Sequence, residues 1–223
     1  MRARRGLILG WVVVGLYAAA LIAVAATTRD GPLRPGDRPS GDDAVEAFID
    51  AWERSREATF VRSGTFERRS EDTGAVITSP DVLAQQPPRR LHRQLGGVDG
   101  RDDRREIVCP APPDDGSDPP PCTFGDPAGP TYAEDVAAEI AALRTQVAGP
   151  SRAYAVEQVG DGCFALAQLR SEPRAAFGTE ARFCFDEATG APTDSRVHYP
   201  GGIVEVVAVS SLTPTVADAD LEP

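Results

Sequence analysis

The spacing of apolar residues after position 42 predicts an amphipathic helix. Four of them fall at positions i, i+3, i+4 and i+7 and therefore share one face: Val45, Phe48, Ile49 and Trp52. Acidic residues, Asp42 and Asp43, occupy the first turn, where the helix dipole favours negative charge. We expect this helix to open the folded domain.

Alternation with a period of two follows, and it predicts strands. Three runs alternate between apolar and polar positions, at residues 59–68, 76–78 and 89–95. Ser79-Pro80 is expected to end the second run. The Gly-rich stretch 96–100 is expected to turn the chain into a further strand at 104–109. Short strands joined by turn residues are typical of an antiparallel meander.

Residues 111–130 break this pattern. They are rich in Pro and Asp and poor in apolar residues, so a surface loop is expected there. A second helix is predicted from Thr131, which forms a capping box with Glu134. An apolar stripe at helical spacing follows, formed by Val136, Ile140, Leu143 and Val147.

The last third of the chain returns to strands. Its alternating runs lie at residues 153–159, 163–170, 181–186, 193–199 and 203–212. Turn sequences such as Gly160-Asp161-Gly162 and Pro200-Gly201-Gly202 separate them. The whole pattern predicts an α+β domain, in which one large antiparallel sheet is covered on one face by two helices.

A different pattern precedes the domain. Residues 6–26 run 21 positions without a charge, and about 20 apolar residues suffice for a helix to span the bilayer core. Arg2, Arg4 and Arg5 precede the stretch, so the positive-inside rule puts the N-terminus in the cytoplasm. A single-pass transmembrane helix is expected. The alternative is a signal peptide cleaved after Ala25, although the stretch exceeds the ~7–15 residues of a usual signal core.

These segments divide the chain into a cytoplasmic tail (1–5), a transmembrane helix (6–26), a Pro/Gly-rich linker (27–41) and an extracytoplasmic α+β domain (42–223). We therefore expect a single-pass protein of the cell membrane. The formal net charge is −11, and outside the first five residues 20 Arg stand against 34 acidic residues. An acidic domain repels nucleic acid, so nucleic acid is not expected as a partner. No cofactor is expected either.

Four cysteines bear on the compartment: Cys109, Cys122, Cys163 and Cys184. They form no C-x-x-C pair and lie far in sequence from both histidines, so no metal site is expected. An even number of cysteines in an exported domain predicts two disulfides, for which three pairings exist. The favoured pairing joins Cys109 to Cys122 and Cys163 to Cys184, because each bond then closes a local element.

The candidate binding residues are Arg89, Arg90, His92 and Arg93, a cluster that would bind an anionic headgroup. They lie within residues 54–105, which carry 11 Arg against 8 acidic residues. The alternative is the solvated face of an amphipathic strand, because alternation explains the same pattern. His198 is interpreted as a residue at the end of a strand. No nucleophile–base arrangement or Gly-x-Ser-x-Gly elbow is present, so neither enzymatic activity nor a catalytic residue is expected.

The order of the elements resembles the LolA-like lipoprotein-carrier superfamily, which includes LppX-like and RseB-like proteins. The resemblance rests on the opening helix with Phe48 and Trp52, the strand at 59–68, the acid-x-x-Thr-Gly-x-Pro turn at 186–192 and the Asp-Leu-Glu-Pro tail. It implies a half-open β-barrel, whose concave apolar side is closed by helices and holds an acyl chain or a lipidated partner. This chain departs from the family in having no lipobox Cys and in its Pro-rich loop.

Two functions are therefore expected for a non-enzymatic binding domain. The first is binding of a lipid or a lipidated partner. The second is a regulatory or scaffolding role, in which the domain contacts another membrane protein without lipid cargo. The sheet's inner face separates these alternatives: a continuous apolar lining favours lipid cargo, whereas a filled or polar interior favours a protein partner.

Overall fold

The structure is a computed structural model that describes residues 41–113, 115–170 and 176–223. The expected cytoplasmic tail, transmembrane helix and almost all of the linker lie outside the described residues. Within the described ranges, no helix has the length and apolar character needed to cross a membrane.

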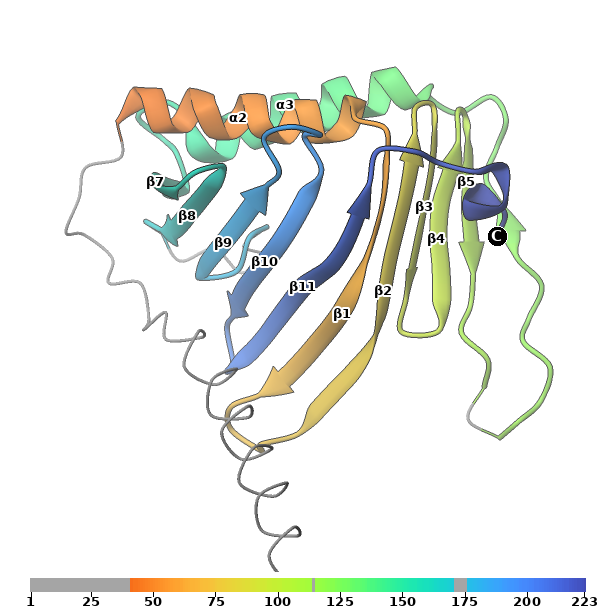
Figure 1. Cartoon of the computed structure of the whole chain (residues 1–223). Coiled ribbons are helices and arrows are strands. Elements are labelled where there is room, and N and C mark those ends of the chain that lie inside the picture. Colours follow the sequence, from red (N-terminus) through yellow and green to blue (C-terminus); the bar gives the residue numbers. More distant parts are fainter. Residues whose placement is uncertain (1–40, 114, 171–175) are drawn as a thin grey trace, which may run out of the picture. The chain divides into compact units, whose positions relative to one another are not determined.

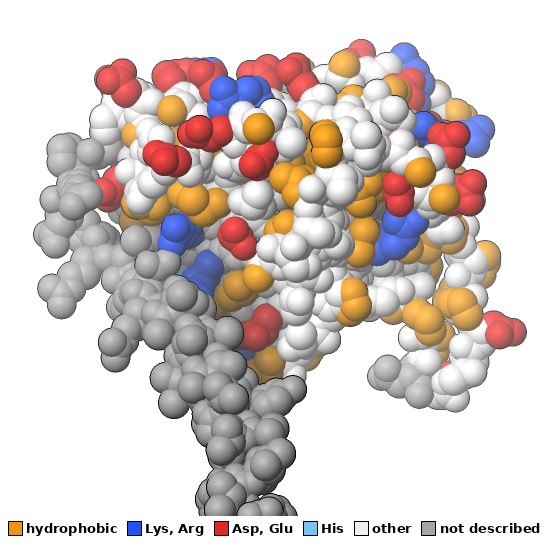
Figure 2. All heavy atoms as spheres, viewed as in Figure 1, with side chains coloured by type: hydrophobic (Ala, Val, Ile, Leu, Met, Phe, Trp, Pro, Cys, Tyr) orange, Lys and Arg blue, Asp and Glu red, His pale blue; other side chains and the backbone are white. Residues whose placement is uncertain are grey.

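Two helices lie side by side along one margin of the sheet, α2 (Asp42–Glu57) and α3 (Tyr132–Val147) (Figure 1). Both agree with the helices predicted from apolar spacing. Thr131 caps α3, and its side chain and that of Glu134 form the expected capping box. Figure 2 shows acidic side chains gathered over the helices, where α2 exposes Asp42, Asp43, Glu46, Asp50, Glu53 and Glu57.

Eleven antiparallel strands form one open sheet, in the order β6-β5-β4-β3-β2-β1-β11-β10-β9-β8-β7. Their bounds are β1 (Phe60–Ser70), β2 (Val76–Gln86), β3 (Arg89–Gln94), β4 (Gly97–Asp102), β5 (Arg105–Cys109), β6 (Thr123–Phe124), β7 (Tyr154–Gly160), β8 (Cys163–Gln168), β9 (Glu180–Phe185), β10 (Pro192–Tyr199) and β11 (Ile203–Thr213). In its middle, β1 pairs with β11, with Val61 opposite Thr213. The two meanders thus join into one curved, unclosed sheet, and the expected α+β half-barrel is confirmed (Figure 1).

The expected end of the second strand at Pro80 is wrong, because β2 continues to Gln86. Pro80 lies opposite Thr65 of β1, and β3 pairs with β2 only from Asp81 onward. Pro80 has no backbone N–H to donate, and no hydrogen bond to β3 is lost there, because β3 does not pair with β2 at Pro80. The continuation was hidden in the sequence because its buried positions include polar residues, Asp81 and Gln85.

The expected turn at residues 96–100 is also wrong, because these residues belong mostly to strand β4. The turn itself is formed by Leu95 and Gly96, which have positive φ angles of 53° and 78°. Gly100 lies opposite Leu91 within the sheet, and a Cβ at Gly100 would approach Leu91 Cδ1 to 2.5 Å. Gly100 is therefore needed for close packing in the strand and does not make a turn.

The part of the sheet formed by β7 to β10 packs against α2 through aromatic side chains. The ring centroids of Phe48 and Phe164 are 5.4 Å apart, and those of Trp52 and Phe183 are 5.2 Å apart. Tyr154 is completely buried in the same cluster, and its hydroxyl donates to the carbonyl of Gly178. Side chains therefore fill the inner side of this part of the sheet, which we call the aromatic half.

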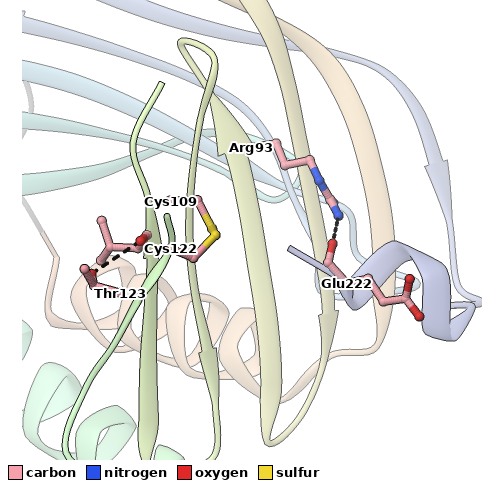
Figure 3. The surroundings of a disulfide bond; sticks show 6 residues. Arg93, Cys109, Cys122, Thr123 and Glu222 are labelled. Atoms are coloured by element: carbon pink, nitrogen blue, oxygen red, sulfur yellow. Dashed lines mark hydrogen bonds between the residues drawn. A yellow bond between two sulfur atoms is a disulfide. The ribbon is translucent and has the colours of Figure 1, made fainter. Parts of the chain in front are cut away.

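The C-terminal tail folds back over the outer face of β2 and β3 as a short 3₁₀ helix, η1 (Asp218–Leu221). Arg93 donates to the carbonyl oxygens of Asp220, at 3.0 Å, and of Glu222 (Figure 3). Arg89 pairs with Asp218 on the same face. Leu91, between these two Arg along β3, is only 1% exposed.

Both disulfides have the pairing that was favoured from the sequence. Cys109 is joined to Cys122, and Cys163 to Cys184, each pair with a Cα–Cα distance of 4.1 Å. Cys163 and Cys184 lie directly opposite each other in β8 and β9, whereas Cys109 ties the Pro-rich loop to β5 (Figure 3). Two disulfides are typical of a domain outside the cytoplasm.

Candidate functional site

The inner face of strands β1 to β5 carries many polar side chains, in contrast to the aromatic half. Directly opposed side chains of adjacent antiparallel strands lie on the same face. The register forms two rows on this face, Arg62, Leu83, His92 and Asp99 in one and Gln85, Arg90, Arg101 and Glu106 in the other. Leu83 is apolar, and apolar residues also end the rows, with Val108 of β5 opposite Asp99 and Phe60 of β1 opposite Gln85. We call this surface the polar half.

A pocket of about 260 Å³ separates the polar half from the helices. We call it the polar pocket, because most of its lining is charged. Strands β3 to β5 contribute Arg90, His92, Asp99, Arg101 and Glu106, and the helices contribute Arg56, Tyr132, Asp135 and Glu139. Pockets for small ligands usually measure ~300–1,000 Å³, so this pocket suits a small polar group.

A second pocket of about 150 Å³ lies towards the aromatic half, and we call it the apolar pocket. Its walls are mostly apolar, although Arg62 and Asp194 also line it; the apolar side chains are those of Trp52, Leu83, Phe183, Phe185, Pro192 and Val207. Arg56 and Arg90 line both pockets, so they mark the boundary between them. Within the described residues, the two pockets do not form a continuous apolar channel.

Two arginines of the polar pocket are held by acidic residues of α3. Arg56 pairs with Glu139, which also accepts a hydrogen bond of 2.8 Å from Trp52 Nε1. Burial alone would raise the pKa of Glu139, but the charge and hydrogen bond of Arg56 and the hydrogen bond of Trp52 lower it overall. Arg101 pairs with Asp135. The charges of both arginines are therefore compensated within the domain.

Arg90 is different, because its guanidinium makes no ion pair or hydrogen bond with another residue of the described ranges. Its Nε atom is buried without a partner. Arg101 lies directly opposite it in β4, which places two like charges side by side. Desolvation, together with the positive charge of Arg56, lowers the pKa of Arg90 to about 10. Arg90 thus remains charged at neutral pH without a direct ion-pair partner, and the charge of Glu139, which is paired with Arg56, offsets its own only in part.

Asp81 organises a buried polar cluster next to the polar pocket. Its carboxylate accepts hydrogen bonds from His92 Nε2 at 2.7 Å and Gln94 Nε2 at 2.9 Å, and Arg62 Nη1 lies 2.9 Å away. Burial alone would raise the pKa of Asp81, but the hydrogen bond from His92 and the charge of Arg62 lower it overall. Burial lowers the pKa of Arg62, against the opposing effect of Asp81.

The structure does not bring the four candidate binding residues together. Arg90 and His92 line the polar pocket, whereas Arg89 and Arg93 lie on the outer face and bind the C-terminal tail. The alternation predicted for this strand is therefore confirmed, and it divides the cluster between two faces.

Sequence reasoning missed several residues of the site. Asp81 and Gln85 lay in a run that had not been recognised as a strand. Gln85 Nε2 donates to the carbonyl oxygens of Ser55 and Ala58, at 2.7 Å and 2.8 Å, and so satisfies the C-terminal end of α2. Arg56 and Glu139 come from helices far apart in sequence. The one available signal was that Asp81 and Gln85 lie four positions apart and would therefore face the same side of a strand.

Comparisons with solved structures return distant similarities. The chain is 18% identical over 81% of its length to a protein in the complex structure of Pseudomonas aeruginosa MucA/MucB, with a TM-score of 0.43, and spans 61% of that chain. A LolA superfamily protein from Nitrosomonas europaea matches 80% of the chain at 10% identity, covers 97% of its own length and has a TM-score of 0.34. A DUF1329 family protein from Desulfovibrio piger matches 83% of the chain at 11% identity, with 98% of its own length and a TM-score of 0.36.

These structures include the superfamily that the sequence resembles. With TM-scores of 0.43 and below, they carry no argument about ligand or partner. No family model matches the chain. No curated protein matches it either.

Proposed function

We propose that this chain is a membrane-anchored, non-enzymatic binding domain that contacts another membrane protein outside the cytoplasm, without lipid cargo. Residues 1–5 would be cytoplasmic, residues 6–26 would span the membrane, and residues 27–41 would link the anchor to the domain at 42–223. The uncharged stretch of 21 residues behind three Arg supports the anchor. The two disulfides support an oxidising compartment.

The choice of a protein partner rests on the polarity and packing of the side chains inside the half-barrel. A carrier of acyl chains needs a continuous apolar cavity, since each buried CH₂ contributes about 0.8 kcal/mol. Here the aromatic half is packed with its own side chains, and the polar half presents arginines and carboxylates. Desolvating those charges against an acyl chain would be unfavourable. A polar or filled interior therefore favours a protein partner over lipid cargo.

The non-enzymatic part of the proposal rests on the surroundings of His92. The imidazole hydrogen-bonds Asp81, and within the described part of the chain no hydrogen bond joins it to a hydroxyl or thiol nucleophile. A covalent mechanism needs such a pair. The charged residues of the polar pocket instead pair mostly with one another, as expected for a recognition surface.

Site-specific photo-crosslinking in intact membranes tests this function. Asp99 is exposed at the polar pocket, whereas Asp102 is exposed in the same strand but on the outer face. A crosslinker at position 99 is expected to give a discrete protein adduct, and one at position 102 is the matched control. Adducts with lipid alone at position 99, or no adduct there at all, would contradict the proposal.

A further inference from the structure

Arg90 lies at the boundary between the polar pocket and the apolar pocket, and it has no ion-pair partner. Arg56, which also lines both pockets, is neutralised by Glu139. Asp135 is occupied by Arg101. The remaining acids of the polar pocket, Asp99 and Glu106, are exposed to solvent. No carboxylate of the described residues therefore forms an ion pair with Arg90, and Glu139, which attracts it at longer range, is already paired with Arg56.

An unpaired guanidinium that is partly removed from water is energetically costly. The cost is higher here because Arg101 lies directly opposite and Arg56 is near enough to lower the pKa of Arg90. An oxyanion would reverse this cost, since the planar guanidinium matches the geometry of carboxylate and phosphate groups. The buried and unsatisfied Nε atom adds a hydrogen-bond donor that such a ligand would satisfy.

We propose that Arg90 is the centre of a binding site for an oxyanion that carries a short apolar group. The oxyanion, a carboxylate or a phosphate ester, would lie against the guanidinium at the boundary, and its apolar group would enter the apolar pocket beside Trp52 and Leu83. That pocket measures about 150 Å³, which is the size of an apolar cavity that holds benzene, so a group of about six carbon atoms fits. The inference goes beyond the proposed function, because it concerns a small ligand at one residue.

Calorimetric titration of the full chain in phosphatidylcholine nanodiscs tests the site, with empty nanodiscs as the blank. N-acetylleucine probes a carboxylate ligand and hexyl phosphate probes a phosphate ester. N-acetylleucinamide and hexanol are their neutral counterparts. At least one anionic probe is expected to bind, and its neutral counterpart is expected to bind at least about tenfold more weakly, because a charged hydrogen bond is lost. The tighter of the two anionic probes identifies the chemistry of the natural ligand.

Two variants locate the site. Arg90→Gln is expected to weaken the anionic probe by about tenfold or more. Arg89→Gln is the matched control, since Arg89 is the neighbouring residue on the outer face, and it should leave affinity within about twofold.

Equal affinity for anionic and neutral probes, no binding of either anion, or unchanged binding by Arg90→Gln would overturn the proposal. The comparison of anionic with neutral probes needs only the wild-type chain, so it decides the matter even where Arg90→Gln does not fold. The calorimetric titration involves no partner protein, so a negative result there is distinguishable from a negative result of the crosslinking experiment.

Discussion

Arg62 Nη1 of β1 lies 2.9 Å from the Oδ2 atom of Asp81 in β2, and Asp81 is 0% exposed. This pair stands on the inner face where a lipid carrier would need apolar residues. His92 and Gln94 hold the other carboxylate oxygen, so the position of Asp81 is determined by three strands. The pair links the stability of the domain to the polarity of its interior.

Replacing one member of this pair should be strongly destabilising. Asp81→Asn leaves Arg62 charged and buried without a counter-ion, and such losses cost about 3–5 kcal/mol in the free energy of unfolding. Urea denaturation measures the change. Asp99→Asn, on the same face but exposed, is the control and should change stability by about 0.5 kcal/mol or less. Equal effects of the two substitutions would show that the buried pair contributes no stability.

The same carboxylate predicts how stability depends on pH. The pKa of Asp81 is lowered in the folded state, so its contribution is complete above the unfolded-state value of about 3.9 and is lost as the pH falls through the lower folded-state value. The difference in unfolding free energy between wild type and Asp81→Asn should therefore be constant from pH 7 to about pH 5 and shrink below about pH 4. A difference that persists undiminished to the acid limit of folding argues against the ionised pair.

The two disulfides should differ in what their loss does. Removing either should cost about 2–5 kcal/mol. Cys163→Ser is expected to unfold the sheet, because the bond joins β8 to β9 beneath the aromatic cluster. Cys109→Ser is expected mainly to loosen the Pro-rich loop, which hydrogen exchange of residues 110–122 would detect. Non-reducing peptide mapping tests the pairing, and a peptide that links Cys109 to Cys163 or Cys184 would refute it.

The membrane topology is tested by a phosphatase fused after Pro223. The charge distribution at residues 2–5 predicts that the fusion is exported and active, and that the chain keeps its N-terminus in the membrane fraction. N-terminal sequencing is the second measurement. A mature chain that begins at Ala26 would show that residues 1–25 are a cleaved signal peptide.

Local chemistry explains which parts of the fold were predictable. The capping box at Thr131, the helix face with Phe48 and the opposed pair Cys163–Cys184 each depend on short-range patterns, and the structure has all three. Strand β2 was missed beyond Pro80, because Asp81 and Gln85 are polar although they are buried, and the usual alternation of apolar residues is therefore absent.

The site was less predictable than the fold, because it is made by long-range contacts. The pairing of β1 with β11 and the approach of Glu139 to Arg56 join segments far apart in sequence. The sequence cluster that contains Arg90 pointed to the right strand, but alternation sends Arg89 and Arg93 to the other face. No spacing in the sequence indicates which arginine remains without a partner.

A domain without lipid cargo has no interior cavity for acyl chains. Mass spectrometry of lipids extracted from the domain at residues 42–223, exported and purified without detergent, measures this. We expect no lipid to accompany the protein in stoichiometric amount, because the aromatic half is filled and the polar half is charged. A single class of long-chain lipid recovered in stoichiometric amount would contradict it.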